Sequence, residues 1–315
     1  MEWIQPMEPV LSRQLITGPE WLHEIKWDGI RGMTYITGEV FRLFTKKGNE
    51  RTAFYPELSG ILQQIGFKTA VLDGEIIVLD ANGNPSFYSS LIRERVRDVK
   101  KVAYYSRIHP VMYVLFDILY ADGKSLAGVP LSERKEMLKS CFEKSDRITL
   151  TDSFENAEAL YEMMKSKGWE GIVTKKSDSL YKGGKQHNLW YKIKFTKKML
   201  AVIGGIQWKD NMPNSLILGI YKDESLIFIG KASTGLTQEQ IYLLKSYYKE
   251  LEQSSNPFAD INLKGAPKGI TWMAPSLTCW VGFAEFTDDG VLRHPRILGF
   301  STSSANEANG KEYVL

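Results

Sequence analysis

The chain has 315 residues, a length that favours two domains over one. Hydrophobic residues make up 43% of the chain and charged residues 24%, which excludes disordered, collagen-like and disulfide-scaffold proteins. The longest uncharged stretch, residues 269–284, contains Pro275 and is shorter than the ~20 apolar residues that span a bilayer. The N-terminus carries Glu2 where a secretory signal has basic residues. We therefore expect a cytoplasmic protein that does not associate with membranes.

Lysines are concentrated in one part of the chain. The net charge is only +3, from 40 Lys and Arg against 37 Asp and Glu, which by itself says little about a polyanionic partner. Residues 165–200, however, contain ten lysines and two acidic residues. This basic block is a candidate nucleic-acid contact, and a solvated protein face is the alternative. The cysteines, Cys141 and Cys279, lack a thiol or histidine at metal-ligand spacing, so we interpret both as buried or free thiols.

The first two thirds of the chain mix short β-rich runs with a few helical patterns, which is typical of the α+β class. We expect strands on either side of a turn at 24–27 and 32–36. Further strands are predicted at 41–44, 71–72, 75–79 and 111–118. Helices are predicted at 56–65, 130–142 and 155–167, and the last of these repeats its apolar residues on one face.

The last third is richer in strands. We expect strands at 200–207, 215–221, 226–231, 281–286 and 291–292. One helix opens at Thr237, with Gln240 at the spacing of a capping box. This set suits a small closed β-barrel such as an OB-fold. We place the boundary after Lys198, which gives domains 1–198 and 199–315, and we expect the tail 301–310 to be loosely held.

The segment 26–31 reads Lys-Trp-Asp-Gly-Ile-Arg. On a strand, Lys26 and Asp28 would share one face, Gly29 would permit a tight turn, and a guanidinium would follow at Arg31. A lysine amine must lose its proton before it can act as a nucleophile, and desolvation or nearby cations favour that loss. The segment is therefore a candidate catalytic element, and a solvated strand end is the alternative.

This segment and five others, in order along nearly the whole chain, resemble the covalent nucleotidyltransferase superfamily of ATP-dependent DNA ligases, RNA ligases and mRNA capping enzymes. Residues 26–31 look like the adenylated-lysine motif KxDGxR. The other five are Thr-Lys-Lys-Gly at 45–48, Asp-Gly-Glu at 73–75, Phe-Asp-Ile-Leu at 116–119, Glu-Gly-Ile-Val-Thr-Lys at 170–175 and Trp-Tyr-Lys-Ile-Lys at 190–194. Each alone also fits a turn, a core residue or a solvated strand. Six in the expected order are a specific signal.

Within the superfamily the chain is most similar to bacterial ATP-dependent DNA ligases of the ligase D type. Residues 283–295 resemble their late signature, a carboxylate strand followed by a Thr-x-x-Gly turn and Leu-Arg-x-Pro. The chain departs from the pattern at Lys46, where the family usually has arginine. It departs again at 299–304, Gly-Phe-Ser-Thr-Ser-Ser, where the family usually has an Arg-x-Asp-Lys cluster that assists pyrophosphate release. The efficiency of adenylation is therefore open, and Arg293 or Arg296 could substitute.

The resemblance implies the fold: a nucleotidyltransferase domain of ATP-grasp-like antiparallel sheets with helices, followed by an OB-fold domain. It also implies an enzyme that uses ATP with Mg²⁺ or Mn²⁺ to seal 5′-phosphate/3′-hydroxyl nicks through lysyl-AMP and DNA-adenylate. Lys26 would be the nucleophile, and Lys192 and Lys194 would face the α-phosphate. The residues expected to be catalytic are Lys26, Asp28, Arg31, Lys192 and Lys194.

Phe116 would stack on adenine, whose edge main-chain groups of Glu24 and Ile25 would read. Glu75 and Glu170 would bind the metal ion or a ribose hydroxyl. The residues expected to contact ATP are Glu24, Ile25, Lys26, Arg31, Lys46, Glu75, Phe116, Lys192 and Lys194. The residues expected to contact DNA phosphates are Lys182, Lys185, Lys197 and Lys198.

The resemblance further implies a monomer that acts on nicked or broken double-stranded DNA, in repair or end joining, with Ku and separate polymerase or nuclease chains as partners. Alternatives are an RNA ligase, a GTP-dependent capping-type enzyme, or a catalytically silent OB-fold nucleic-acid-binding protein.

Overall fold

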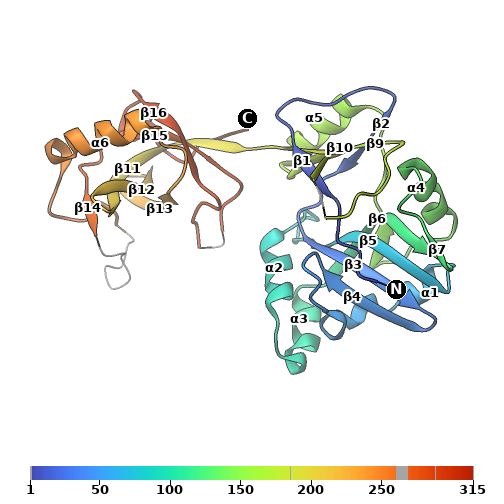
Figure 1. Ribbon diagram of the computed structural model, residues 1–315. Coiled ribbons are helices and arrows are strands. Elements are labelled where there is room, and N and C mark those ends of the chain that lie inside the picture. The colour runs from blue at the N-terminus through green and yellow to red at the C-terminus, as the bar shows by residue number, and fades with distance from the viewer. Residues whose placement is uncertain (1, 185, 260–268, 288, 315) are drawn as a thin grey trace. The chain divides into compact units, whose positions relative to one another are not determined.

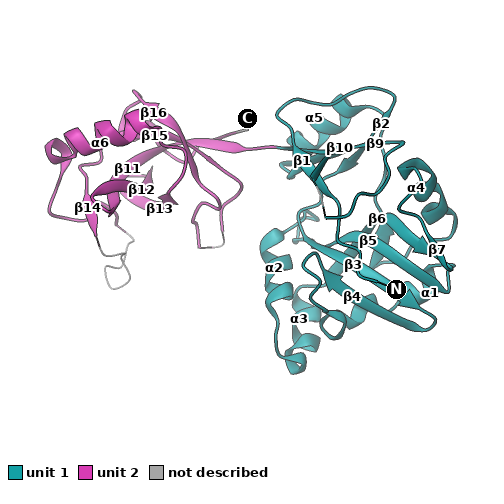
Figure 2. Ribbon diagram, in the orientation of Figure 1, with its two compact units in different colours: residues 1–194 teal, residues 195–315 magenta. Residues whose placement is uncertain are grey.

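The computed structural model describes residues 2–184, 186–259, 269–287 and 289–314. The chain forms two compact units, Met1–Lys194 and Phe195–Leu315 (Figures 1 and 2). Lys197 and Lys198, which the predicted boundary assigns to the first domain, pair with strands of unit 2. Each unit has its own hydrophobic core.

Unit 1 contains a large sheet with strand order β4-β3-β5-β6-β7, and β8 lies parallel to β6. Its strands are β3 (Ile30–Thr37), β4 (Val40–Thr45), β5 (Thr69–Val78), β6 (Val111–Ala121), β7 (Lys124–Ser125) and β8 (Ile148–Leu150). The turn from β6 to β7 places Asp122 and Gly123 at φ 38° and 88°, as an Asp-Gly hairpin turn requires. The predicted strands 71–72 and 75–79 are one continuous strand, because Asp73-Gly74-Glu75 pairs on both sides rather than turning.

A second, smaller sheet in unit 1 has the order β1-β10-β9-β2. Its strands are β1 (Glu8–Leu11), β2 (Trp21–Ile25), β9 (Gly171–Lys176) and β10 (Gln186–Lys194). Gly171 opens β9 at φ 146°, and a Cβ there would lie 2.0 Å from the carbonyl oxygen of Ile193. Only glycine fits this close approach of two strands.

Helices pack on both sheets of unit 1. They are α1 (Ile61–Gln64), α2 (Phe87–Arg95), α3 (Val102–Ile108), α4 (Leu131–Ser140) and α5 (Ala157–Lys167), with 3₁₀ turns η1 (Thr52–Phe54), η2 (Pro56–Leu58) and η3 (Val99–Lys101). The predicted helix 155–167 is confirmed, with Asn156 as N-cap and Gly168 as left-handed C-cap. The continuous helix predicted at 56–65 is wrong, since η2 and α1 are separate and Gly60 lies between them.

Unit 2 is a strongly curved sheet with the order β13-β12-β11-β15-β16, in which β14 and β17 also pair with β11. Its elements are β11 (Lys197–Lys209), β12 (Met212–Lys222), β13 (Ser225–Ala232), α6 (Gln238–Leu251), β14 (Ile270–Trp272), β15 (Thr278–Phe283), β16 (Arg296–Ser301), η5 (Ala305–Glu307) and β17 (Glu312–Val314). The predicted capping box of Thr237 and Gln240 is confirmed. The strand predicted at 291–292 is absent, because Leu292 forms only an isolated bridge with Phe286.

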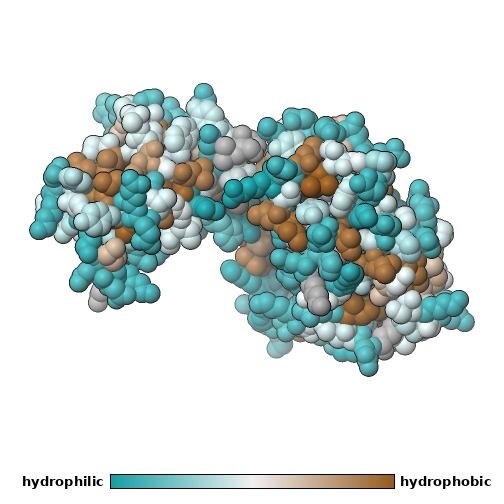
Figure 3. Space-filling view, turned by 45° about the horizontal axis from the view of Figure 1, so that its top comes forward, coloured by the Kyte–Doolittle hydropathy of each residue, from teal (hydrophilic) through white to brown (hydrophobic). Residues whose placement is uncertain are grey.

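The tail is held more firmly than its composition predicts. Ala308 is fully buried, and its carbonyl oxygen accepts a hydrogen bond from the backbone of Tyr221 at 2.7 Å. Cys141 is partly buried and Cys279 buried, and both are free thiols. Apolar side chains reach the surface in small groups among hydrophilic ones (Figure 3). In the described part of the chain, no helix has the length and apolar character needed to cross a bilayer.

Candidate active site

A cavity in unit 1 is lined by side chains from both of its sheets. Strands β1, β2, β9 and β10 contribute from the small sheet, and β3, β5 and β6 from the large one. Every residue expected to contact ATP lines it: Glu24, Ile25, Lys26, Arg31, Lys46, Glu75, Phe116, Lys192 and Lys194. Segments far apart in the sequence therefore meet at one place, as the motif order predicts.

Lys26 is held at the cavity wall by an ion pair with Glu170. Its Nζ lies 2.5 Å from Glu170 Oε2, and Lys194 Nζ lies 2.5 Å from Oε1 of the same carboxylate. Burial opposes the charge on Glu170, but the two ammonium groups outweigh it and lower its pKa below the usual range. The strand predicted at 24–27 ends at Ile25. Lys26 is thus in a loop, and Lys26 and Asp28 do not share a strand face as predicted.

Lys192 and Lys194 lie two residues apart on β10 and both line the cavity, which confirms that they share a face. Partial burial, with Lys194 and Lys26 as neighbouring cations, lowers the pKa of Lys192. The side chains of Lys26, Lys192 and Lys194 therefore meet at one cavity. Such a cluster is suited to stabilising charge that develops on phosphoryl oxygens.

Arg31 lies against the aromatic side of the cavity. Its guanidinium makes a two-pronged ion pair with the buried Asp73, at 2.7 and 2.6 Å, and its Cζ lies 4.9 Å from the centre of the Phe116 ring. Tyr181 donates a hydrogen bond to Asp73 at 2.7 Å. Asp73 and Tyr181 thus fix the orientation of Arg31.

Glu75 is a carboxyl group of the cavity with a raised pKa. Burial raises it to about 7, although Lys26 and Arg31 favour the charged form. A carboxylate that is poorly compensated in this way suits a divalent cation. Within the described residues there is no group of three or more His, Cys, Asp or Glu side chains that could hold a metal ion by themselves.

Glu24 lines the cavity and belongs to a buried ion-pair cluster. Its carboxylate is 2.5 Å from Lys135 Nζ and 2.7 Å from Lys175 Nζ. The ammonium of Lys175 also lies 4.3 Å from the ring centre of Phe116 and 4.4 Å from that of Trp190. Burial opposes ionisation of Glu24, yet the two lysines hold its pKa below the usual range. The ammonium of Lys175 therefore contacts both Glu24 and two aromatic rings of the cavity lining.

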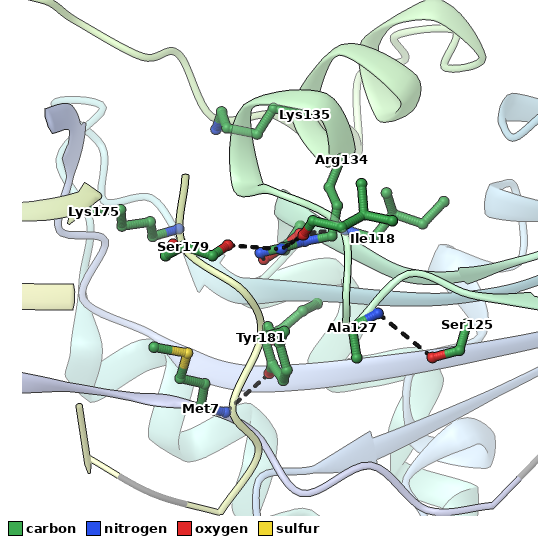
Figure 4. A network of polar contacts seen from close by, with 12 residues as sticks. Met7, Ile118, Ser125, Ala127, Arg134, Lys135, Lys175, Ser179 and Tyr181 are labelled. Atoms are coloured by element: carbon green, nitrogen blue, oxygen red, sulfur yellow. Dashed lines mark hydrogen bonds and ion pairs between the residues drawn. The ribbon is translucent and has the colours of Figure 1, made fainter. Parts of the chain in front are cut away.

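The sequence did not single out the contribution of α4. Arg134 is fully buried and pairs with Asp117 at 2.7 and 2.8 Å, and the next residue, Lys135, pairs with Glu24. Figure 4 shows both side chains leaving α4 in the network that includes Lys175 and Tyr181. The available signal was an arginine on the apolar face of a predicted helix, between Leu131 and Leu138.

Lys46 lines the cavity, and the remaining predicted residues lie elsewhere. Asp28 does not line the cavity, and Lys46 lies at its rim, 2.7 Å from Glu8. Lys182 is exposed in unit 1, and Lys185 falls outside the described residues.

Two more predicted DNA contacts belong to unit 2, where Lys197 pairs with Glu312 at 3.0 Å and Lys198 lies 5.0 Å from the Trp280 ring centre. Arg293, a candidate substitute for the missing basic cluster, pairs with Glu285 in the same unit.

Two family models match the chain. Residues 8–194 match the ATP dependent DNA ligase domain, and residues 209–302 match the ATP dependent DNA ligase C terminal region. The chain therefore belongs to the ATP-dependent DNA ligase family. Unit 1 corresponds to the nucleotidyltransferase domain and unit 2 to the OB-fold domain, which confirms the predicted fold class.

The particular relatives are ligases of the ligase D type. The multifunctional non-homologous end joining DNA repair protein LigD of Mycobacterium tuberculosis (strain ATCC 25618 / H37Rv) is 32% identical over 283 residues, which cover 87% of this chain and 35% of the relative. The ligase domain of M. tuberculosis LigD is 27% identical, with a TM-score of 0.53 and 98% of each chain covered. Mycobacterial DNA ligase D complexed with ATP and MES is 29% identical, with a TM-score of 0.52 and 97% of each covered. The predicted likeness is confirmed, and the chain spans about a third of LigD's length.

Proposed function

We propose that this chain seals nicks in double-stranded DNA by transferring AMP from ATP to Lys26 and then to the 5′-phosphate. The observation that carries the proposal is the convergence of Lys26, Lys192 and Lys194 on one cavity with Glu170 between two of them. The family and the ATP named in a related structure support the choice of nucleotide.

In the first step the amine of Lys26 attacks the α-phosphorus of ATP, so that a P–N bond forms and the P–O bond to pyrophosphate breaks. Glu170 accepts a hydrogen bond from Lys26 and is the group within reach of the departing proton. Lys192 and Lys194 stabilise the negative charge on the phosphoryl oxygens. An oxygen of the DNA 5′-phosphate then displaces Lys26 from AMP. Finally the 3′-hydroxyl attacks that phosphate and AMP leaves.

We assign a Mg²⁺ or Mn²⁺ ion to Glu75 and Glu170, together with the nucleotide phosphates. The raised pKa of Glu75, which burial takes to about 7, supports the assignment because a bound cation would compensate this carboxylate. When bound, the ion neutralises phosphate charge. We further assign adenine stacking to Phe116, reading of the adenine edge to Glu24 and Ile25, and the nucleotide sugar to Arg31 and Lys46.

Other parts of the proposal concern the substrate and the setting. We assign DNA phosphates to Lys182, Lys185, Lys197 and Lys198, and adenylation to domain 1–198. Since similar proteins are named as non-homologous end joining proteins, we place this chain in the joining of broken DNA. Its partners there would be Ku and separate polymerase or nuclease chains. We propose a cytoplasmic monomer in which Asp28 supports catalysis as part of the motif.

The proposal is tested by incubating the protein with α-³²P-ATP and Mg²⁺ and running a denaturing gel. The wild type should take up label, and Lys26→Ala should take up none while still sealing nicks that are already adenylated, because only the first transfer needs the amine. Lys176→Ala, a lysine that pairs with Asp178 outside the cavity, should label normally. Label on Lys26→Ala, or labelling of the wild type by GTP in place of ATP, would contradict the proposal.

A further inference from the structure

The segment that follows β5 carries a positive surface that the sequence motifs do not include. Helix α2, turn η3 and helix α3 follow one another along one flank of unit 1 (Figure 1). Their exposed cationic residues are Arg95, Arg97, Lys100, Lys101 and Arg107. We call these three elements with their exposed side chains the α2–α3 surface.

The charge of the α2–α3 surface is not neutralised by ion pairs within the part of the chain that the structure describes. None of its five cations forms an ion pair with any residue that the structure describes, whereas buried Arg93 pairs with Glu57 at 2.6 Å. Among the described residues, the side chain of Arg97 donates hydrogen bonds only to backbone carbonyl oxygens, at 2.7 Å to that of Glu94 and at 3.4 Å to that of Val96. The local acids are engaged otherwise. Glu94 faces Arg51, and Asp98 accepts a hydrogen bond from the backbone of Lys100.

The same surface also exposes large apolar and aromatic side chains. Tyr88 is 41% exposed, Val99 57%, Tyr104 54% and Ile108 43%. Exposed aromatic rings interleaved with unpaired cations are the pattern of surfaces that bind nucleic-acid strands, with cations on phosphates and rings on sugars or bases. A face that served only solubility would not need the exposed rings.

The α2–α3 surface is rigidly preformed. Arg93 on α2 donates hydrogen bonds to the carbonyl oxygen of Phe54 at 2.9 Å and to Ser106 on α3 at 3.1 Å. Ser90 accepts a hydrogen bond from the backbone of Val78 on β5 at 3.0 Å. The cations are therefore presented on a fixed scaffold, so binding does not require this segment to fold.

The α2–α3 surface begins beside the candidate active site. The loop before α2 contains Asn84, whose side-chain oxygen accepts a hydrogen bond from Trp169 Nε1 at 2.9 Å. Trp169 directly precedes Glu170, and its ring centre lies 5.4 Å from that of Trp27, the neighbour of Lys26. A strand that enters the cavity can thus continue along α2.

We propose that the α2–α3 surface binds the sugar-phosphate backbone of the DNA next to the strand break. This inference rests on the proposed function for the identity of the strand. Its cations neutralise phosphates, and Tyr88 and Tyr104 lie against sugars or unpaired bases.

The test measures binding of a labelled nicked duplex, without ATP, over a series of salt concentrations. The variant Arg97→Gln/Lys100→Gln/Lys101→Gln should bind more weakly, and its salt slope should fall by up to about 3 units, at ~0.9 per lost phosphate contact. Self-adenylation should stay unchanged. The matched control changes three exposed lysines elsewhere in unit 1, as Lys124→Gln/Lys139→Gln/Lys144→Gln, and should keep the wild-type slope.

A second variant separates aromatic from ionic contact. Tyr104→Ala should weaken binding about 5-fold or more with an unchanged salt slope, because a ring contact releases no counterions. An unchanged salt slope in the triple variant would overturn the inference. Binding of polyglutamate by the wild type in preference to the nicked duplex would overturn it as well. If the wild type takes up no AMP but the triple variant still loses its slope, the proposed function fails and this inference stands.

Discussion

At the scale of single residues, the ionisation of Glu75 has a measurable consequence. Burial raises its pKa in the folded protein to about 7, from an ordinary value of 4.5. Between these values the folded state holds a proton that the unfolded chain has released, so stability falls as pH rises from 4.5 through 7. The loss is complete above pH 7 and amounts to at most about 3 kcal/mol.

Glu75→Gln should remove this loss. The free energy of unfolding of the variant should therefore increase relative to that of the wild type as the pH is raised from 5 to 8. Urea titrations at both pH values measure it, and exposed Glu155→Gln is the control. The variant should also adenylate poorly because it lacks the proposed metal ligand. If the free energy of unfolding depends on pH equally in wild type and variant, the raised pKa of Glu75 is contradicted.

At the scale of elements, two consecutive residues of α4 form ion pairs with the two sheets that line the cavity. Arg134 neutralises Asp117 on β6, and Lys135 neutralises Glu24 on β2. The helix therefore links the two sheets from which the cavity is built. Removing one partner of a buried ion pair leaves the other charge without compensation. This destabilises the folded state more than replacing both partners by apolar residues would.

Lys135→Met should raise KM for ATP in self-adenylation about 10-fold with a smaller effect on kcat. The reason is that Glu24 loses one of its two cations, so that the cavity lining around Glu24 shifts. Lys135→Arg should recover most of the affinity. Lys139→Met, an exposed lysine on the same helix, is the control. A KM unchanged by Lys135→Met would mean that Lys135 supports the fold without positioning Glu24 for nucleotide binding.

At the scale of the whole molecule, the two units have separate cores. The core of unit 1 is built around β5 and β6, with Leu72 and Leu115 fully buried, and the core of unit 2 around β11 and β12, with Ile203 and Leu218 fully buried. Separate cores predict separate cooperative transitions on heating.

Leu218→Ala should lower one transition in scanning calorimetry, because deleting a buried leucine side chain destabilises by about 2–5 kcal/mol. ATP should raise the other transition by mass action, since the proposed nucleotide site lies in unit 1. Leu72→Ala is the reciprocal control and should lower the transition that ATP raises. A single transition shifted alike by ATP and by both variants would contradict independent units.

Sequence alone predicted nine of the residues that line the cavity but not the way in which they are held. Lys192 and Lys194 were predictable as one face of a strand because the side-chain period of a strand is two. The loop conformation of Lys26 was not, because β2 ends where the backbone N–H of Lys26 donates a hydrogen bond to the carbonyl oxygen of Gly171, a contact between segments far apart in the chain. Local propensity contains no information about such a contact.

The order of the six motifs, the spacing of the lysines on β10 and the capping box at Thr237 are properties of the chain itself, and they determined the family, the two-domain fold and which motif residues to look for in one cavity. Tertiary structure alone decided that Asp73-Gly74-Glu75 lies inside a continuous strand, that Arg134 and Lys135 pair with Asp117 and Glu24, and that the five cations of the α2–α3 surface have no ion-pair partner among the described residues. The physical reason is that ion pairing and burial depend on distances between residues remote in sequence, and only the folded chain sets those distances.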